Sequence, residues 1–530
     1  MRGSGMMRST AVALLLAGAV PLSAETLPEA LAAAYEANPQ LAVQRAIVRQ
    51  ADEGVPQALS AGRPSLTATG SAQQSGSDFS RDGGRFYQGA LSLNQSLYRG
   101  GRTRTAVNAA ENRIYAARAR LRAVEDNVLL EVVTAYADVL RYGATVELNQ
   151  NQVKVLQREL QASRDRFEVG DLTRTDVAQS DARLANAQSN LVIAQGQLNT
   201  ARNAYLRVVG HPPAGLAPLP PIPLLPGTVG QAVDLANANN PSLIAARFDE
   251  AAARFDVGTI ERGRRPSLGV GTGLNYTYVQ SGVGGFTSTG TSSSGSGSSS
   301  GGTTGTGSTT TAGTGTGGTT GTLGTGATGT SGAAASTIGS VSGSGGSFQQ
   351  TVGLSLSVPL YQAGLDGSQI RAAQAVRSQF MEQIGFVGRQ VAETAQNAFV
   401  SVATARAVIA ADESSVRANT LALEGVSQEN QVGTRTVLEV LNAEQELVVA
   451  RVNLAAARRD EYVAAYTLLA AVGAAEADVL AVPAPHYDAT ANAARVRHKW
   501  NDYDTDPNPP PLPRPDPVSA SKSVLIGPPR

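Results

Sequence analysis

Two similar stretches of sequence lie far apart in this chain: VGDLTRTDV at residues 169–177 and VGTRTVLEV at residues 432–440. Each begins with Val-Gly, continues through polar residues to a Thr, and has an acidic residue three positions after that Thr. A phrase that recurs within one chain indicates an internal repeat, so the structure that each stretch forms should occur twice.

Each stretch has the residues of a tight turn between two helices. A Gly in the left-handed conformation commonly ends a helix. A Thr can cap the next helix, and an acid at the third helical position closes a capping box by accepting a hydrogen bond from the Thr backbone. We therefore predict two helix–turn–helix tips, with the Gly, Thr and acid supplied by Gly170, Thr173 and Asp176 in the first and by Gly433, Thr436 and Glu439 in the second.

Other motifs recur at two fixed offsets. NPQL (38–41) returns as NPSL (240–243), which defines the smaller offset. LNQSLYRGG (93–101) is similar to LSVPLYQAG (356–364), which defines a larger offset, and the two tip stretches keep this larger one. Such offsets indicate a tandem duplication. The difference between them corresponds to a net insertion in the second copy.

Composition divides the chain between these repeats. Residues 281–347 are almost wholly Gly, Ser and Thr without a charged residue, a composition that predicts a disordered loop. We predict the following segments: a first repeat at 25–210, a Pro-rich linker at 211–227, a second repeat at 228–480 that contains this loop, and a Pro-rich disordered tail at 481–530.

Residues 1–24 have the pattern of an export signal. Arg2 and Arg8 lie in the positively charged N-terminal region of the signal. AVALLLAGAV (11–20) is its apolar core, and Leu22-Ser23-Ala24 fits a cleavage site. The apolar core is shorter than the roughly 18 residues that a spanning helix needs. We expect a mature chain that starts at Glu25, where no Cys is present for lipidation. Such a protein is periplasmic, secreted, or inserted in an outer membrane through β-strands.

The overall composition excludes several classes of function. The 530 residues include 43 basic and 43 acidic side chains, three His and no Cys. Because the charges balance, the sequence lacks the excess of basic residues that is typical of nucleic-acid-binding proteins. The absence of Cys excludes a thiolate nucleophile and, together with the few His, argues against a zinc site. We expect no metal and no cofactor.

Apolar residues alternate with small or polar ones around the Gly/Ser/Thr-rich loop. The pattern covers residues 267–278 and 348–360, with a matching pair near 65–77 and 87–98 in the first copy. Strands of about ten such residues are typical of membrane barrels, although half-buried strands of a soluble sheet have the same pattern. Single-chain membrane barrels begin at 8 strands. Four strands would therefore have to be shared, giving 8 strands from two chains or 12 from three.

The rest of the chain has helical periodicity. No Pro occurs between Arg102 and Val169, which allows roughly 100 Å of straight or interrupted helix. After the first tip, apolar residues follow a seven-residue spacing, at Val177, Leu184, Leu191, Leu198 and Tyr205, with a line of Ala beside them. This spacing predicts coiled-coil seams with closely approaching backbones.

As a set, these features resemble the TolC-type outer-membrane efflux proteins over about residues 25–480. The set comprises the export signal, the duplication, two helix–hairpin–helix units, LYRGG after the second strand and the paired tips. The resemblance implies a mainly α-helical protomer with four transmembrane β-strands. It further implies a homotrimer in the cell outer membrane, with a shared 12-stranded barrel and a long periplasmic α-helical barrel.

The resemblance also implies partners and site residues. TolC-type proteins export drugs or, in type I secretion, unfolded proteins, by docking onto an inner-membrane ABC or RND transporter and its periplasmic adaptor (membrane fusion) protein. By position, Arg435 is the basic link residue, Asp176 its partner and Glu439 the pore-facing acid of the periplasmic aperture. Asn442 stands where the family often has a second acid, so a weaker acidic ring is expected. The adaptor-docking tips would comprise Val169, Gly170, Thr173, Val432, Gly433 and Thr436.

Three functional hypotheses remain. The leading one is a passive exit duct, because the sequence has no GxxxxGK[ST] nucleotide-binding loop. The alternative is a periplasmic coiled-coil adaptor or scaffold with soluble hairpins. For the single residues, the alternative roles are capping alone for Asp176 and Glu439 and a solvated tip position for Arg435. An exported enzyme is the third, but acids at helix tips lack the apolar pocket that would tune their pKa values. We therefore expect no enzymatic activity.

Overall fold

The computed structural model describes residues 24–75, 84–170, 172–280, 345–480 and 482–507. The predicted signal peptide (1–24), apart from its last residue, lies outside this range. Residues 281–344 of the predicted loop at 281–347 also lie outside the described range, so that only its last three residues are described. Those three residues correct the prediction, because the fourth strand already begins at Gly345.

Four antiparallel strands form one sheet in the order β1-β2-β3-β4. Their bounds are Ser65–Ser75 for β1, Gly84–Tyr98 for β2, Ser267–Gln280 for β3 and Gly345–Ser357 for β4. Apolar residues of β4 are largely solvent-accessible in the single chain, with exposed fractions of 72% for Val352 and 68% for Leu354. The face that the alternation predicted to be apolar is therefore uncovered in one chain.

Helices make up most of the remaining structure. The first half contains α1 (Leu27–Ala37), α2 (Pro39–Asp52), α3 (Gly54–Ser60), α4 (Arg102–Glu168) and α5 (Arg174–Val209). The second half contains α6 (Val229–Asn239), α7 (Pro241–Glu261), the short 3-10 helix η1 (Arg262–Arg264), α8 (Leu365–Gln431), α9 (Val437–Ala471) and α10 (Ala491–Val496). Among the described residues, no helix combines the length and apolar character needed to cross a bilayer.

The two halves have matching elements at the offsets seen in the sequence. Helices α1 and α6 begin at Leu27 and Val229, which differ by the smaller offset. Helices α4 and α8 begin at Arg102 and Leu365, which differ by the larger offset, and both contain 67 residues. A helix of this length extends about 100 Å, so the predicted long helices form without interruption.

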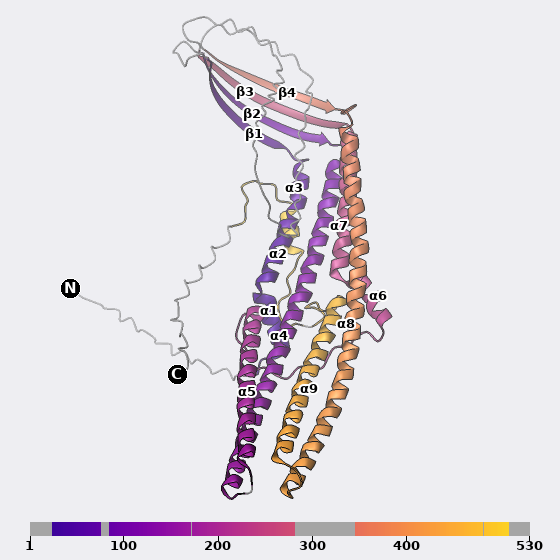
Figure 1. The fold of residues 1–530 in the computed structure, drawn as a ribbon. Helices are drawn as coiled ribbons and strands as arrows, with labels where there is room; N and C mark the ends of the chain where they lie inside the picture. Colours follow the sequence, from indigo (N-terminus) through magenta and orange to yellow (C-terminus); the bar gives the residue numbers. More distant parts are fainter. Residues whose placement is uncertain (1–23, 76–83, 171, 281–344, 481, 508–530) are drawn as a thin grey trace, which may run out of the picture.

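The sheet and the helical tips lie at opposite ends of the molecule (Figure 1). Helices α4 and α8 both run from the sheet to the far end, where α5 and α9 fold back along them. The shorter helices α1–α3, α6 and α7 flank the upper and middle parts of these long helices. This arrangement places the two tips side by side, as far from the sheet as the chain reaches.

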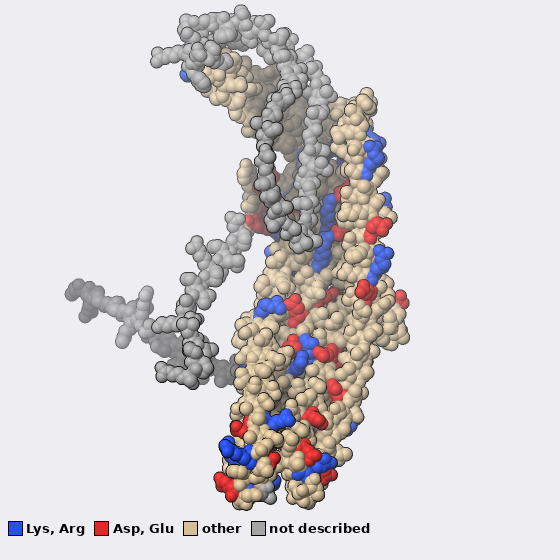
Figure 2. Space-filling view, in the orientation of Figure 1, with Lys and Arg blue, Asp and Glu red and all other residues tan. Residues whose placement is uncertain are grey.

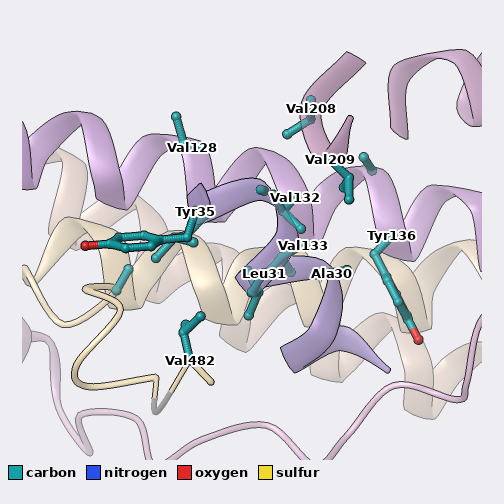
Figure 3. Close-up of a cluster of buried hydrophobic side chains, with 14 of the residues drawn as sticks. Ala30, Leu31, Tyr35, Val128, Val132, Val133, Tyr136, Val208, Val209 and Val482 are labelled. Atoms are coloured by element: carbon teal, nitrogen blue, oxygen red, sulfur yellow. The ribbon is translucent and has the colours of Figure 1, made fainter. Parts of the chain in front are cut away.

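A core at mid-height holds the helices together. It combines side chains of α1, α4, α5 and α9, and Figure 3 shows Leu31, Val132 and Val482 gathered in this cluster. Tyr136 is fully buried, and its hydroxyl lies 2.9 Å from the carbonyl oxygen of Glu25 and 2.7 Å from that of Ala217. The non-helical linker at 211–227 is thereby attached to α4, together with the N-terminal end of the described chain.

The prediction of a disordered tail from residue 481 is wrong for residues 482–507. Val482 and Val496 are 4% and 1% exposed, and α10 packs beside α2. Asn492 donates to the buried carboxylate of Asp52 at 2.8 Å. These apolar and polar contacts between opposite ends of the sequence offset the ordering entropy, which the local Pro-rich composition could not reveal. Residues 481 and 508–530 lie outside the described range.

Candidate functional site: the paired helical tips

Both tips have the turn geometry that their sequences predict. Gly170 and Gly433 follow the ends of α4 and α8 with φ values of +83°, the left-handed conformation that Gly adopts without a steric penalty. Thr173 then caps α5 and Thr436 caps α9, each in an extended conformation. The predicted helix–turn–helix tips are therefore confirmed.

The two acids close capping boxes, as predicted. The Thr173 backbone N–H donates to Asp176 Oδ2 at 3.0 Å, and the Thr436 backbone N–H donates to Glu439 Oε2 at 2.9 Å. In return, the Asp176 and Glu439 backbone N–H groups donate to the Thr hydroxyls. Each acid thus satisfies a backbone donor that the helix start would otherwise leave unpaired.

Arg435 binds two acids of its own hairpin. Its Nε donates to Glu429 Oε2 at 2.8 Å and its Nη1 to Glu439 Oε1 at 2.9 Å. The Thr436 backbone N–H and the Arg435 guanidinium lower the pKa of Glu439, which therefore stays charged to lower pH than an ordinary Glu. The predicted pair of Arg435 with Asp176 is not formed within the described part of this chain. A contact of this kind between neighbouring chains stays a prediction.

Near the tips, Arg183 links the two hairpins, and farther from the tips Arg459 of α9 pairs with Asp138 of α4 at 2.8 Å. Arg183 lies on α5, and its guanidinium donates from Nη2 to Asn442 Oδ1 at 2.7 Å and from Nη1 to Gln445 Oε1 at 2.6 Å. Both acceptors lie on α9, so one side chain joins the first hairpin to the second. Asn442, which was expected to weaken the acidic ring, therefore accepts a hydrogen bond that connects the two hairpins.

An apolar contact lies beside the two hydrogen bonds of Arg183. Leu441 of α9 is 2% exposed and packs in a cluster with Val153 and Leu156 of α4 and with Ala187 of α5. We call Arg183, Leu441, Asn442 and Gln445 the hairpin seam. The seven-residue spacing predicted an apolar face on α5, but it did not show that Leu441 of α9 would insert against this hairpin.

A half-buried acid sits on the same stretch of α9. Glu444 Oε2 has no hydrogen-bond partner among the described residues. Burial raises the pKa of Glu444 to about 7, and the nearby Glu159 contributes to this rise, whereas the Gln152 side chain and the charge of Arg158 oppose it. Because Glu159 and Arg158 belong to α4, Glu444 experiences the charges of the other hairpin. The hairpin seam therefore has a titratable neighbour close to neutral pH.

The tips themselves are exposed and mixed in character. Val169 and Val432 are 80% and 76% exposed at the ends of the two hairpins. Acidic and basic side chains surround the tips in Figure 2. Between the hairpins, a cleft of about 460 Å³ is lined by α4, α5 and α9, and Arg183, Leu441 and Gln445 of the seam belong to its lining. In the described residues no group of three or more His, Asp or Glu has the arrangement of a metal site.

Comparison with known proteins identifies the group of proteins to which this architecture belongs. The sequence model for outer membrane efflux proteins matches residues 30–211 and 319–474. Outer membrane efflux protein BepC of Brucella suis biovar 1 is 31% identical over 497 residues, which cover 92% of this chain and 95% of BepC. Outer membrane protein TolC of Vibrio cholerae serotype O1 is 25% identical over 87% of this chain and 94% of its own length.

The fold agrees with the sequence match. The crystal structure of the Campylobacter jejuni CmeC outer membrane channel superposes with a TM-score of 0.64 at 12% identity, covering 89% of both chains. The sheet at one end and the long helices therefore match those of a known channel. The chain belongs to the outer membrane efflux protein family, whose members are outer-membrane channels with a long periplasmic helical domain.

Proposed function

We propose that this chain is the exit duct of an export system, a passive channel in the outer membrane that docks onto an inner-membrane transporter through a periplasmic adaptor. One observation carries the proposal. A four-stranded sheet and two helical tips lie at the ends of uninterrupted helices about 100 Å long. A duct that connects a membrane barrel to a distant partner needs this length.

The membrane part of the proposal requires more than one chain. Strands β1 and β4 are the outer strands of the described sheet, so each has a partner on one side only. Unpaired strand edges are intolerable in lipid. Apolar side chains on α8 are also exposed in the single chain, among them Phe386 (57%) and Val400 (56%). We propose that three tandemly duplicated chains close 12 strands into one barrel and their helices into one tunnel.

The first prediction concerns this assembly. The full-length chain has a mass of 54.5 kDa, and the purified protein in detergent is expected to have the mass of three chains after the detergent contribution is subtracted. Light scattering or native mass spectrometry measures this directly. A stable monomer or dimer would contradict the shared 12-stranded barrel, because four or eight strands would then have to close alone.

The tips form the periplasmic aperture in this proposal. Glu439 is held in place by Arg435 and the Thr436 backbone and would present a charged ring to the pore of the assembly. Val169 and Val432 expose apolar surface at the ends of the hairpins, which suits the docking of an adaptor. The alternative of a periplasmic scaffold with soluble hairpins is disfavoured by the uncovered apolar face of β4.

The second prediction concerns pH and rests on Glu444. A carboxyl with a raised pKa is neutral in the closed seam below about pH 7. In separated hairpins it would ionise near its ordinary pKa. The closed seam therefore binds more protons, and its stability falls as pH rises through 7. Conductance in planar bilayers is expected to increase between pH 6 and pH 8, as the charged Glu444 faces Glu159.

The Glu444→Gln variant should have a conductance that no longer changes between pH 6 and pH 8, because its amide cannot ionise. Glu446→Gln is the matched control, since Glu446 is exposed on the same helix and should keep the pH dependence. Glu439 does not contribute in this range, because its pKa is lowered. An unchanged pH profile in the Glu444 variant would show that another group controls the aperture.

A further inference from the structure

Arginines gather where the helices meet the sheet. We call eight of them the arginine collar; its members are Arg63, Arg99, Arg102, Arg104, Arg262, Arg264, Arg265 and Arg371. They come from four places along the chain: the segment after α3, the start of α4, η1 with the residue after it, and the start of α8. On the face shown in Figure 2, blue surface lies over the upper end of α8, below the mostly tan sheet.

Close backbone packing brings these four places together. A Cβ added at Gly101 would lie 3.5 Å from Cδ of Arg262, which places η1 against the start of α4. A Cβ at Gly367 would lie 3.8 Å from Arg264 Nη2 and 3.3 Å from Arg371 Nη1, which places η1 beside the start of α8. A Cβ at Gly62 would lie 3.6 Å from Thr103 Cγ2, which places the segment after α3 beside the start of α4. The four places are therefore neighbours at the sheet end of the helices.

Within the described residues, no collar arginine forms an ion pair. Arg63 donates to the Lys499 carbonyl at 2.7 Å and Arg265 to the Gly100 carbonyl at 3.4 Å, so neutral backbone acceptors hold these side chains. Burial and the charge of Arg102 lower the pKa of Arg99, which is the effect expected where positive charge lacks a counter-charge.

The arginines immediately farther from the sheet differ from the arginine collar. The next four along α4 each lie within 4.0 Å of a carboxylate oxygen: Arg113 with Asp256, Arg118 with Asp52, Arg120 with Asp249 and Arg122 with Glu476. The fold thus pairs these arginines with internal acids. Glu261 and Asp366 adjoin the arginine collar along the chain, but in the described residues no carboxylate lies within ion-pair distance of a collar arginine, so a ligand that carries negative charge would find these guanidinium groups free of ion pairs.

The position of the arginine collar relative to the membrane identifies the ligand. Tyr98 ends β2 and is 50% exposed, while Leu360 and Tyr361 follow β4 and are 92% and 87% exposed. Exposed aromatic side chains are typical of the membrane–water interface. Arg99 directly follows Tyr98, so the arginine collar lies at the depth of the headgroups on the periplasmic side.

We propose that the arginine collar binds the phosphate groups of anionic phospholipids in the periplasmic leaflet of the outer membrane. The proposal rests on the exit-duct orientation, with the sheet in the membrane and the helices in the periplasm. Guanidinium groups match the geometry of phosphate oxygens and donate two parallel hydrogen bonds. Basic clusters next to a membrane bind anionic lipids through this attraction. Bound lipid would supply the counter-charge to the collar.

The test measures lipid binding to the full-length protein purified in detergent. Native mass spectrometry counts the molecules of phosphatidylglycerol and of zwitterionic phosphatidylcholine that each complex retains. Phosphatidylglycerol should be retained preferentially by the parent protein. The triple variant Arg262→Gln, Arg264→Gln, Arg265→Gln should bind it at least about tenfold more weakly, because each arginine near a membrane surface contributes to anionic-lipid attraction.

The matched control is the triple variant Arg174→Gln, Arg202→Gln, Arg417→Gln. It removes the same charge from exposed positions on α5 and α8, away from the sheet, and should retain the lipid. Replacing the three η1-segment arginines with Lys should preserve part of the binding. Equal loss in both Gln triples, equal retention of phosphatidylcholine, or displacement by millimolar inorganic phosphate would overturn the proposal.

The same spectra separate this proposal from the exit-duct proposal. A trimer without preferential binding of phosphatidylglycerol would overturn the lipid site and leave the duct intact. A monomer that binds phosphatidylglycerol through the arginine collar would contradict the trimeric duct and support the lipid site.

Discussion

Replacing Arg183 with Ala is expected to raise channel conductance by roughly tenfold, because it removes the two hydrogen bonds that join α5 to α9 near the tips. A hydrogen bond to a charged group contributes about 1.5–3 kcal/mol where it is partly buried, and less at an exposed position. Even about 1 kcal/mol per chain, summed over the three chains of the proposed trimer, would shift a closed–open equilibrium by about two orders of magnitude. Single-channel recordings in planar bilayers measure the effect.

The control for this prediction is Arg174→Ala. Arg174 lies on the same helix, nearer the tip, and is exposed. Its replacement removes the same charge and should leave conductance close to that of the parent protein. Arg183→Lys should give an intermediate conductance, since one ammonium group does not reproduce the fork that reaches two amides. If Arg183→Ala and Arg174→Ala conduct alike, the hairpin seam does not hold the aperture closed.

Replacing Tyr136 with Ala should destabilise the protein by about 3–5 kcal/mol, the usual cost of removing a buried aromatic side chain. The ring is fully buried in the mid-height core. Burial and the nearby Glu25 raise the pKa of Tyr136 to about 12, so its hydroxyl remains a donor at any physiological pH. Loss of this hydroxyl also leaves the linker carbonyl of Ala217 without the hydrogen bond from Tyr136.

Urea unfolding followed by helical circular dichroism tests the prediction for Tyr136. Tyr136→Phe should cost only about 1–3 kcal/mol, since it removes the hydroxyl and keeps the ring. Tyr503→Ala serves as the control, because Tyr503 is 94% exposed and its loss should change the free energy of unfolding by less than about 0.5 kcal/mol. Equal unfolding midpoints for the Tyr136 and Tyr503 variants would show that the core does not depend on this ring.

Much of the fold could be predicted because its signals are local. The Gly–Thr–acid order in both tips specifies a left-handed helix end followed by a capping box, and each needs only residues within one turn. The strands were predicted within a few residues, since alternation has a period of two along each strand. Long Pro-free segments likewise predicted the long helices.

The candidate site could be predicted only in part. The tip residues follow from turn chemistry, whereas Arg183 and Gln445 are ordinary polar residues of amphipathic helices and have no sequence signal. Their importance depends on how α5 lies relative to α9, and Leu441 of α9 packs against α4 and α5 at this contact. The interpretation of Arg435 as a link to Asp176 missed the two acids of its own hairpin, Glu429 and Glu439.

The turns of this chain, its strands and its repeated elements follow from sequence patterns alone. These properties are set by short-range sterics, capping and periodicity, which act within a few residues of each other. Only the tertiary structure decided that Arg183 joins the hairpins, that residues 482–507 pack against the first half, and that eight arginines meet below the sheet. Such contacts connect residues that are far apart in the sequence, and the burial that stabilises them exists only after the helices have packed.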